Sequence, residues 1–440
     1  MKKSKRRLVT VFLAILCLSA NAQGKWTLKS CIDTAYKMNI SLHQGKLSSQ
    51  IEKIKLGQSK AGLFPNLNLN DAHSLNWGTS YDPSINQYGN SNLSINNPSL
   101  NSSVTLYNGS LLVNTIRQNK LIYAAGMLDV EKIQNDILLN VLAAYMQVLM
   151  DYEAIDVAQA QMEETDIQVK QTQKFVDFGK LAELSLLQIQ SQLAAEKLVK
   201  VNAENQLQLD RLTLLQLMNL PVRRDFDIER QELKALFPEI PMSSEEIDKI
   251  SESFLPEIKS ASLKTNASLF SLKMAESGWF PKLMMGGSLT TMYSNLNHDA
   301  VPYQFTNNFG QAIDVTLAVP IFNNLQVKSN VAISKIDVVN ARLNEEQTKN
   351  DLRKSIETAY TNMVSAGKNL TVTVEQMELE KRTYSEMATK YSVGTVDATD
   401  FLVEKNNYNR VSMSLIQAKY NYVLTTKMVD FYLGKPLTDN

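Results

Sequence analysis

The fold is decided around residues 391–400, Tyr-Ser-Val-Gly-Thr-Val-Asp-Ala-Thr-Asp, the one strong turn signal in a proline-free run over 321–435. Only Gly367, Gly394 and Gly434 interrupt this run. Proline inside a helix costs about 3 kcal/mol and glycine about 1 kcal/mol, so the composition permits very long helices. The sequence predicts a helix over about 323–391, a turn, and a returning helix to about 433. At 1.5 Å per residue the first arm is about 100 Å long, which suits a coiled coil or a barrel wall.

An earlier part of the chain repeats this unit. Residues 99–220 again lack proline, and Gly179 takes the place of Gly394. The same offset of 215 relates three further pairs of landmarks: Tyr107 and Phe322, Ser185 and Asp400, Pro221 and Pro436. A near-constant offset marks an internal repeat. We therefore divide the chain into repeat 1 over 23–220, a linker with a short surface element over 221–242, and repeat 2 over 243–440.

Residues 1–22 have the pattern of a signal peptide. Five basic residues precede an apolar stretch over 8–19 and the small-x-small site Ala20-Asn21-Ala22. The exported chain keeps 40 basic and 45 acidic residues, a net charge of −5, which does not favour a nucleic-acid partner. Cys31 is then the single cysteine, so packing rather than a disulfide must hold the fold. Whether Cys17 carries a lipid stays open, although Leu16 before it is bulky for such a site.

Four stretches alternate with a period of two and are predicted to be strands. They lie at about 66–81, 93–107, 282–293 and 305–321, the second with a bulge or bend near 96–98. They follow helical stretches predicted over 26–64 and over 243–277, the latter interrupted at Pro256. Loops are expected over 82–92 and 297–302. One face of each strand is mainly apolar and the other is rich in Asn, Ser and Thr, as in a membrane barrel with a wet lumen. Asp314 would face that lumen and Val315 the lipid.

The mature chain contains no apolar run of the ~18 residues expected of a membrane helix. Any part inside a membrane must therefore consist of strands. Four strands cannot close a barrel, and an open edge in lipid leaves backbone groups unpaired at a cost of several kcal/mol each. This points to a cyclic homo-oligomer. A soluble α+β protein, or a periplasmic coiled-coil scaffold, remains the alternative at this point.

Short segments in both repeats resemble the TolC-like outer membrane efflux proteins. They are residues 61–67 (Ala-Gly-Leu-Phe-Pro-Asn-Leu), 143–149 (Ala-Ala-Tyr-Met-Gln-Val-Leu), 216–221 (Gln-Leu-Met-Asn-Leu-Pro) and 432–436 (Tyr-Leu-Gly-Lys-Pro). The resemblance implies an α+β membrane protein. Long helical hairpins would form a periplasmic α-barrel, and four strands per chain would contribute to a trimeric twelve-strand β-barrel in outer membrane lipid. It also implies a passive exit duct for drugs or metabolites, working with a periplasmic adaptor and an inner-membrane pump. A type I protein secretion conduit is an alternative with the same fold.

The resemblance also places both glycine turns at the periplasmic tip. It implies adaptor docking by residues of the two turns: Gly179, Lys180, Ser185 and Leu186 in the first, and Gly394, Thr395, Phe401 and Leu402 in the second. Carboxylates would ring the closed pore at Asp400 and, because Val403 occupies the second expected position, at its neighbour Glu404. Asp400 has a second reading as the N-cap of the returning helix, worth about 1 kcal/mol.

Motifs for catalysis are absent from the sequence. It has no phosphate-binding glycine loop, no GxSxG and no HExxH. His43, His73 and His298 lie far apart along the chain. We therefore expect no enzyme activity, no cofactor and no metal site, and energy for transport would come from the partner pump.

Overall fold

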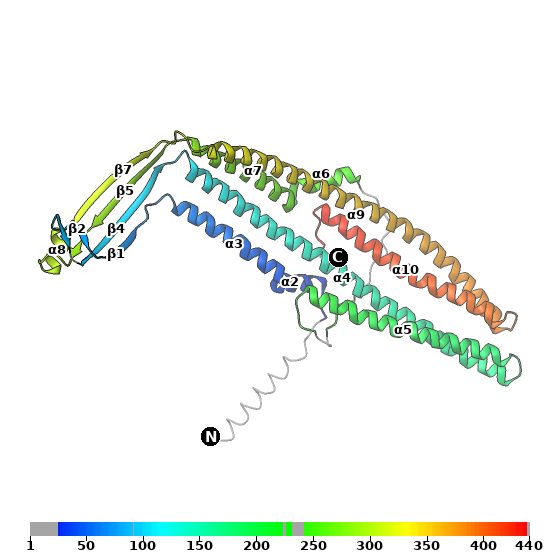
Figure 1. Ribbon diagram of the computed structural model, residues 1–440. Helices are drawn as coiled ribbons and strands as arrows, with labels where there is room; N and C mark the ends of the chain where they lie inside the picture. Colours follow the sequence, from blue (N-terminus) through cyan, green and yellow to red (C-terminus); the bar gives the residue numbers. More distant parts are fainter. Residues whose placement is uncertain (1–24, 91, 223–225, 231–241, 438–440) are drawn as a thin grey trace, which may run out of the picture. The chain divides into compact units, whose positions relative to one another are not determined.

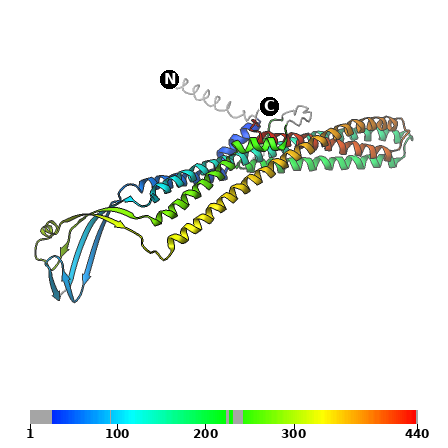
Figure 2. The ribbon, with the colours of Figure 1, turned by 90° about the horizontal axis from the view of Figure 1, so that it is seen from above.

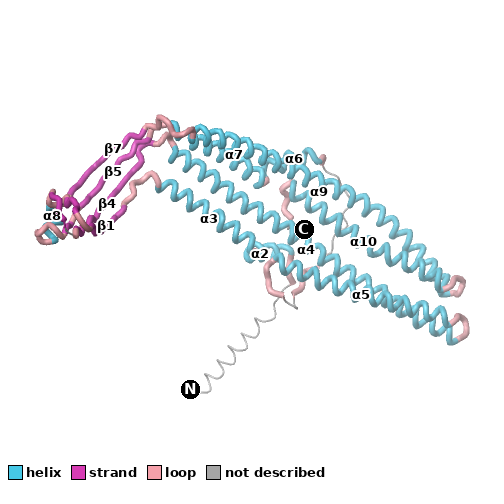
Figure 3. Tube along the Cα trace, viewed as in Figure 1, coloured by secondary structure: helices cyan, strands magenta, loops and turns pink. Residues whose placement is uncertain are grey.

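The computed structural model describes residues 25–90, 92–222, 226–230 and 242–437. The predicted signal peptide and Cys17 lie outside these ranges. Long helices and one main antiparallel sheet make up the described chain (Figure 1; Figure 3). Its contacts divide it into two compact units. The first draws on residues 1–44, 132–255 and 351–440, and the second on residues 45–131 and 256–350.

The internal repeat is confirmed by the long helices. Helices α4 (Leu111–Asp177) and α9 (Gln326–Ser392) each have 67 residues, and α5 (Glu183–Leu217) and α10 (Ala398–Tyr432) each have 35. Every bound in one pair is 215 residues from its counterpart in the other. The proline-free composition therefore produces the two predicted hairpins, α4–α5 and α9–α10.

The first unit contains the ends of both hairpins together with α2 (Leu28–Met38) and α6 (Ser244–Phe254). Both short helices begin at a side-chain cap, Thr27 for α2 and a Ser243–Glu246 capping box for α6. The two hairpins run side by side, as Figure 2 shows, and hydrogen bonds described below join them.

Part of the predicted linker also packs into the first unit. Ile228 pairs with Trp26 in an isolated parallel bridge, and the side chains of Phe226 and Ile228 are buried. The hydroxyl of Tyr145 donates to the carbonyl of Glu229 at 2.9 Å. Glu229 and Arg230 are exposed, so residues 226–230 lie partly inside the fold, beside Trp26, and partly at its surface.

The second unit holds a sheet with the strand order β1-β4-β5-β7, where β1 is Asn68–Asn76, β4 Leu93–Tyr107, β5 Lys282–Thr290 and β7 Gly310–Ala318. All neighbours are antiparallel, and Leu69, Leu100, Leu289 and Gln311 lie in one row. The two-residue strand β6 (Tyr293–Ser294) also pairs with β4. Helices α3 (Ile40–Ala61) and α7 (Pro256–Glu276) and the short turn η1 (Ser277–Trp279) complete the unit with parts of α4 and α9.

The sheet has the two unlike faces that the alternation predicts. On β7, Ile313, Val315 and Leu317 are all exposed large hydrophobic residues, between 63% and 76% accessible. Asp314 projects from the opposite face and lies against Gly286 of β5. Among the described residues, β1 and β7 each pair on one side only, so both outer edges of the sheet lack a partner.

Three predicted boundaries are wrong. The helix over 26–64 is two helices, because Asn39 ends α2 and its side chain accepts from the N–H of Leu42 at the start of α3. The first strand stops at Asn76, and Gly78, with φ +103°, separates it from β2 (Thr79–Asp82). The predicted loop over 82–92 contains β3 (Gln87–Asn90), which forms a hairpin with β2.

Two further strand features also differ from the prediction. Residues 301–307 form helix α8 (Val301–Asn307), where a loop was expected up to residue 302 and a strand from residue 305. Pro302 lies in its first turn, where proline needs no hydrogen-bond partner. The expected bulge at 96–98 does not occur, since β1 and β4 pair in continuous register through Pro98. The register shift of β4 lies instead between Thr105 and Tyr107.

Candidate functional site: the paired helical turns

The turns that close the two hairpins have the same backbone geometry. Gly179 has φ +69° and Gly394 φ +78°, the left-handed region that glycine enters without strain. The N–H of Lys180 bonds to the carbonyl of Phe175 at 2.8 Å, and the N–H of Thr395 to that of Lys390 at 3.0 Å. Each bond spans five residues and matches the Schellman end of a helix. Both predicted glycine turns are therefore present as sharp reversals.

The helices that leave the turns begin differently. The Asp397 side chain caps α10 by accepting from the N–H of Asp400 at 2.9 Å, whereas Ala182 begins α5 without a side-chain cap. The N-cap reading of Asp400 is therefore wrong, and Asp400 is an exposed residue in the first turn of α10. Its carboxylate and that of the half-buried Glu404 remain gate candidates.

The other predicted docking residues divide into buried and exposed groups. Leu186 and Phe401 are buried within the chain, and Ser185 and Leu402 are partly buried. Lys180 is exposed with its ammonium 5.9 Å from the ring centre of Phe175, and the exposed Thr395 donates to the carbonyl of Lys390. Within one chain, Leu186 and Phe401 therefore support the turns, while Lys180 and Thr395 remain accessible.

Sequence reasoning missed the most accessible apolar side chains near the turns. Phe178, next to Gly179, is 77% exposed, and Val393, next to Gly394, is 69% exposed. Three further apolar side chains in the first turns of α5 and α10 are also exposed: Leu184, Leu187 and Val403. The signal was an aromatic or β-branched residue directly before each turn glycine, where water would otherwise favour a polar residue.

An aromatic cluster lies behind the turns. Phe401 stacks on Tyr391 with ring centres 4.7 Å apart, and Tyr384 stacks on Tyr408 at 4.9 Å. Ile189 of α5 packs into the same cluster. The hydroxyls of Tyr391 and Thr172 of α4 are hydrogen-bonded at 3.1 Å. The cluster therefore joins α9 and α10 to the first hairpin just inside the turns.

Next to this cluster, six side chains from all four helices form a polar layer: Glu164, Thr165 and Gln168 of α4, Glu196 of α5, Tyr384 of α9 and Lys405 of α10. Glu164 and Gln168 are half-buried and the other four are buried. Lys405 is completely buried, and its ammonium donates to Gln168 at 3.1 Å. Gln168 donates to the Tyr384 hydroxyl at 3.1 Å, which donates to Glu164 at 2.6 Å. One hydrogen-bonded chain therefore links α10, α4 and α9.

Glu196 supplies the countercharge in the polar layer. Its carboxylate lies 3.9 Å from the ammonium of Lys405 and accepts from Thr165, from Gln192 at 2.9 Å and from Asn409 at 3.2 Å. Burial lowers the pKa of Lys405, and the charges of Glu196 and Glu164 oppose that shift. A charge taken out of water at this depth is tolerated only with such partners.

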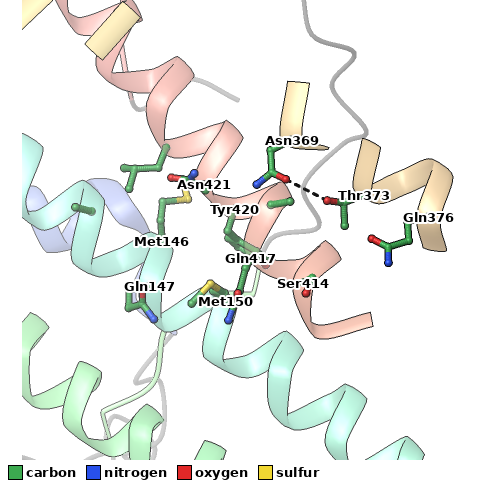
Figure 4. A pocket seen from close by; sticks show the side chains of 13 residues that line it. Met146, Gln147, Met150, Asn369, Thr373, Gln376, Ser414, Gln417, Tyr420 and Asn421 are labelled. Carbon is green, nitrogen blue, oxygen red and sulfur yellow. Dashed lines mark hydrogen bonds between the residues drawn. The ribbon is translucent and has the colours of Figure 1, made fainter. Parts of the chain in front are cut away.

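Farther along the hairpins, a cavity of about 580 Å³ lies between α4, α9 and α10. Its wall consists mainly of amide, hydroxyl and thioether side chains, as Figure 4 shows for Gln147, Gln417, Asn421, Met146 and Met150. Asn369 and Thr373 of α9 face it and are hydrogen-bonded to each other at 3.4 Å. Among the described residues no charged side chain lines this cavity, so it offers contacts to neutral polar groups.

The described residues contain no group of three or more His, Cys, Asp or Glu side chains placed to hold a metal ion. Within the same ranges, no helix is both long enough and apolar enough to cross a membrane.

Two solved structures share this fold. A crystal structure of CusC, a protein that forms a transmembrane channel, superposes on this chain with a TM-score of 0.82. The match covers 95% of this chain and 96% of CusC, at 17% identity. The outer membrane protein VceC of Vibrio cholerae gives a TM-score of 0.80 over 93% and 96% of the two chains, at 13% identity. These likenesses establish the fold.

The family follows from the sequence comparisons. The model of the outer membrane efflux proteins matches residues 32–220 and 255–435, so this chain belongs to that family. Outer membrane protein TolC of Salmonella enteritidis is 22% identical over 389 residues, which are 86% of this chain and 76% of that protein. Toxin and drug export protein A of Aggregatibacter actinomycetemcomitans is 29% identical over 170 residues, and the match covers 38% of this chain and 35% of that relative.

Proposed function

We propose that this chain is the outer membrane exit duct of a tripartite efflux pump and works as a homotrimer. The observation that carries the proposal is the four-stranded sheet. It has two unpaired edges among the described residues and exposed apolar side chains such as Val315 on one face. Three copies supply twelve strands, which close the edges in lipid where unpaired backbone groups cost several kcal/mol each. The apolar face then meets lipid and the Asp314 face lines the lumen.

The helical hairpins form the periplasmic part of the duct in this proposal. Their two turns offer Lys180, Thr395 and the exposed Phe178 and Val393 to a periplasmic adaptor. Asp400 and Glu404 lie at the start of α10, where three copies bring six carboxylates around one axis. The duct itself performs no chemistry, and the inner-membrane pump supplies the energy.

The first test is the native mass of the protein extracted in detergent from purified outer membranes. A particle of three chains is expected. A monomer or dimer in the soluble periplasmic fraction contradicts the proposal and favours a coiled-coil scaffold. Loss of export of a fluorescent pump substrate from cells that lack the gene identifies small molecules as cargo. Normal dye export with loss of a secreted protein favours the type I secretion conduit, an option suggested by the similarity to toxin and drug export protein A.

The second test concerns the turns. Gly394→Val places a β-branched residue at φ +78°, where it costs about 1–2 kcal/mol and distorts the reversal. A Cβ there meets nothing within 4 Å, so the rest of the fold is undisturbed. We expect adaptor binding and export to fall while the trimer persists. Gly394→Asn is the matched control, because asparagine tolerates a left-handed backbone, as Asn219 does at the end of α5. Unchanged export by the valine variant contradicts the docking assignment.

A further inference from the structure

Two carboxyl groups face each other between α4 and α5, away from the turns and the polar layer. Asp151 of α4 is only 4% exposed. Its side chain is in hydrogen-bonding contact with that of Asp210 on α5, which is partly exposed and lines a hollow of about 360 Å³. A buried carboxyl group beside a second one is unfavourable when both are ionised.

Two glutamines hold the carboxyl groups in place. Gln147, one helical turn before Asp151, donates to its Oδ1 at 3.2 Å, and Gln206, one turn before Asp210, donates to its Oδ2 at 2.9 Å. Asp151 Oδ2 has no hydrogen-bond donor among the described residues. The two glutamines therefore leave one oxygen of each carboxyl group available to the other carboxyl group. When both groups are ionised, neither of these two oxygens carries a proton.

Basic side chains near these positions are engaged with other partners. Arg211, next to Asp210 in sequence, bonds to Asp227 at 2.8 Å, and Lys419 of α10 pairs with Glu153 at 3.0 Å. The charged group that acts on Asp151 is Asp210 itself. No cation from α4, α5 or α10 therefore neutralises the pair within the described residues.

We propose that Asp151 and Asp210 share one proton, so that a carboxyl–carboxylate hydrogen bond clasps α4 to α5 and opens as the pH rises. Burial, followed by the neighbouring Asp210, raises the pKa of Asp151 to about 7. Because the pKa is raised from its ordinary value of 3.8, the clasp is complete at acid pH and is lost as the pH passes through about 7. Two like charges then face each other beside the hollow and weaken the pairing of the helices.

A proton fits this pair better than a metal ion does. Calcium takes six to eight oxygen ligands and magnesium six, whereas here two of the four carboxylate oxygens already accept from glutamines. No third acidic, histidine or cysteine side chain joins the pair into a metal-binding group among the described residues. A shared proton needs only the two oxygens that face each other.

The direct test is infrared spectroscopy of the full-length protein in detergent, titrated from acid to alkaline pH. The carboxylic C=O band of a buried protonated acid is expected to disappear around pH 7, with the protonated share falling from about ten to one to about one to ten over two pH units. The band should be absent in Asp151→Asn. In Asp210→Asn it should persist but disappear at a lower pH, because burial still raises the pKa of Asp151 while the neighbouring charge is gone. It should persist in Asp166→Asn, which removes a solvent-exposed carboxylate of α4 that pairs with Lys170.

Heat stability is a second readout, for the case in which a variant folds too poorly for spectroscopy. The heat-inactivation temperature of the unmodified protein should fall as the pH rises through 7, while Asp151→Asn, which still donates to Asp210, should lose that dependence. The proposal is overturned when no titrating band is present in the unmodified protein, when the band survives in Asp151→Asn, or when Asp210→Asn leaves the pH at which the band disappears unchanged. It is also overturned when calcium shifts the heat stability of the unmodified protein and a chelator reverses the shift, because a metal then occupies the pair.

Discussion

The buried Lys405 offers the sharpest test of how the two hairpins are held together. Replacing it with methionine keeps most of the side-chain volume but removes the charge that faces Glu196 at 3.9 Å. Removing one partner of a buried ion pair typically costs about 3–5 kcal/mol, because the other charge stays buried and uncompensated. Glu196 keeps its neutral donors Thr165, Gln192 and Asn409, so we expect the lower end of this range, about 3 kcal/mol.

Native-state hydrogen exchange measures this cost where it arises. A loss of about 3 kcal/mol speeds exchange through local opening about a hundredfold, since 1.4 kcal/mol corresponds to a factor of ten. The acceleration should appear in peptides around residue 405 of α10 and in the facing part of α5. Adding Glu196→Gln to Lys405→Met removes the uncompensated charge, so the double variant should exchange more slowly than Lys405→Met alone. The coupling energy from this cycle should be at least about 1 kcal/mol.

Lys419→Met is the matched control. Lys419 also lies on α10 and pairs with a glutamate of α4, Glu153, at 3.0 Å, but both side chains are 33% exposed. Exposed ion pairs contribute about 0.2–1 kcal/mol, so exchange near residue 419 should change less than tenfold. Equal exchange in Lys405→Met and the unmodified protein, or no coupling with Glu196→Gln, would refute the argument that the polar layer holds the hairpins.

Two further predictions concern the sheet. Val315→Asp places a charge on the apolar face and should impair assembly in the outer membrane, at a cost below the about 2–4 kcal/mol of a lysine or arginine at the bilayer midplane. Thr316→Asp on the opposite face should assemble. Pulse-labelled membrane fractions measure both, and normal insertion of Val315→Asp means that the faces are reversed. Asp314→Asn should reduce the preference of the reconstituted channel for cations. Gly286→Ala should reduce this preference as well, because a Cβ at residue 286 would lie 2.5 Å from Asp314 Oδ1 and must displace the carboxylate. Identical ion selectivity in the unmodified protein and in both variants means that Asp314 does not line the lumen.

The hairpins and the repeat were readable from the sequence because their signals accumulate over many residues. A proline-free run and a 215-residue offset each draw on dozens of positions, and they located helix ends to within a few residues. Strand β4 was predicted with its observed bounds, Leu93–Tyr107.

The errors lie where a few residues decide the backbone. A single side-chain hydrogen bond from Asn39 splits one predicted helix into α2 and α3. Phe305 fits the alternation of the following strand, yet the proline-initiated first turn at Pro302 starts helix α8. Cap geometry was also ambiguous, since Asp397 and Asp400 are both acidic and only the structure shows which one accepts the N–H bond. Such choices depend on local contacts that a periodic pattern does not record.

The polar layer escaped sequence analysis for a different reason, which concerns the repeat itself. At the 215-residue offset, Glu196 corresponds to the buried Val411 and Lys405 to the exposed Gln190. The duplicated backbone is therefore retained while the charges are not. Two equivalent hairpins could pair with copies of themselves. The charges of a lysine on α10 and its glutamate on α5, however, neutralise each other only when the second hairpin packs on the first. Leaving either charge buried alone costs several kcal/mol, so the asymmetry selects one pairing of the hairpins over the alternatives that the repeat permits.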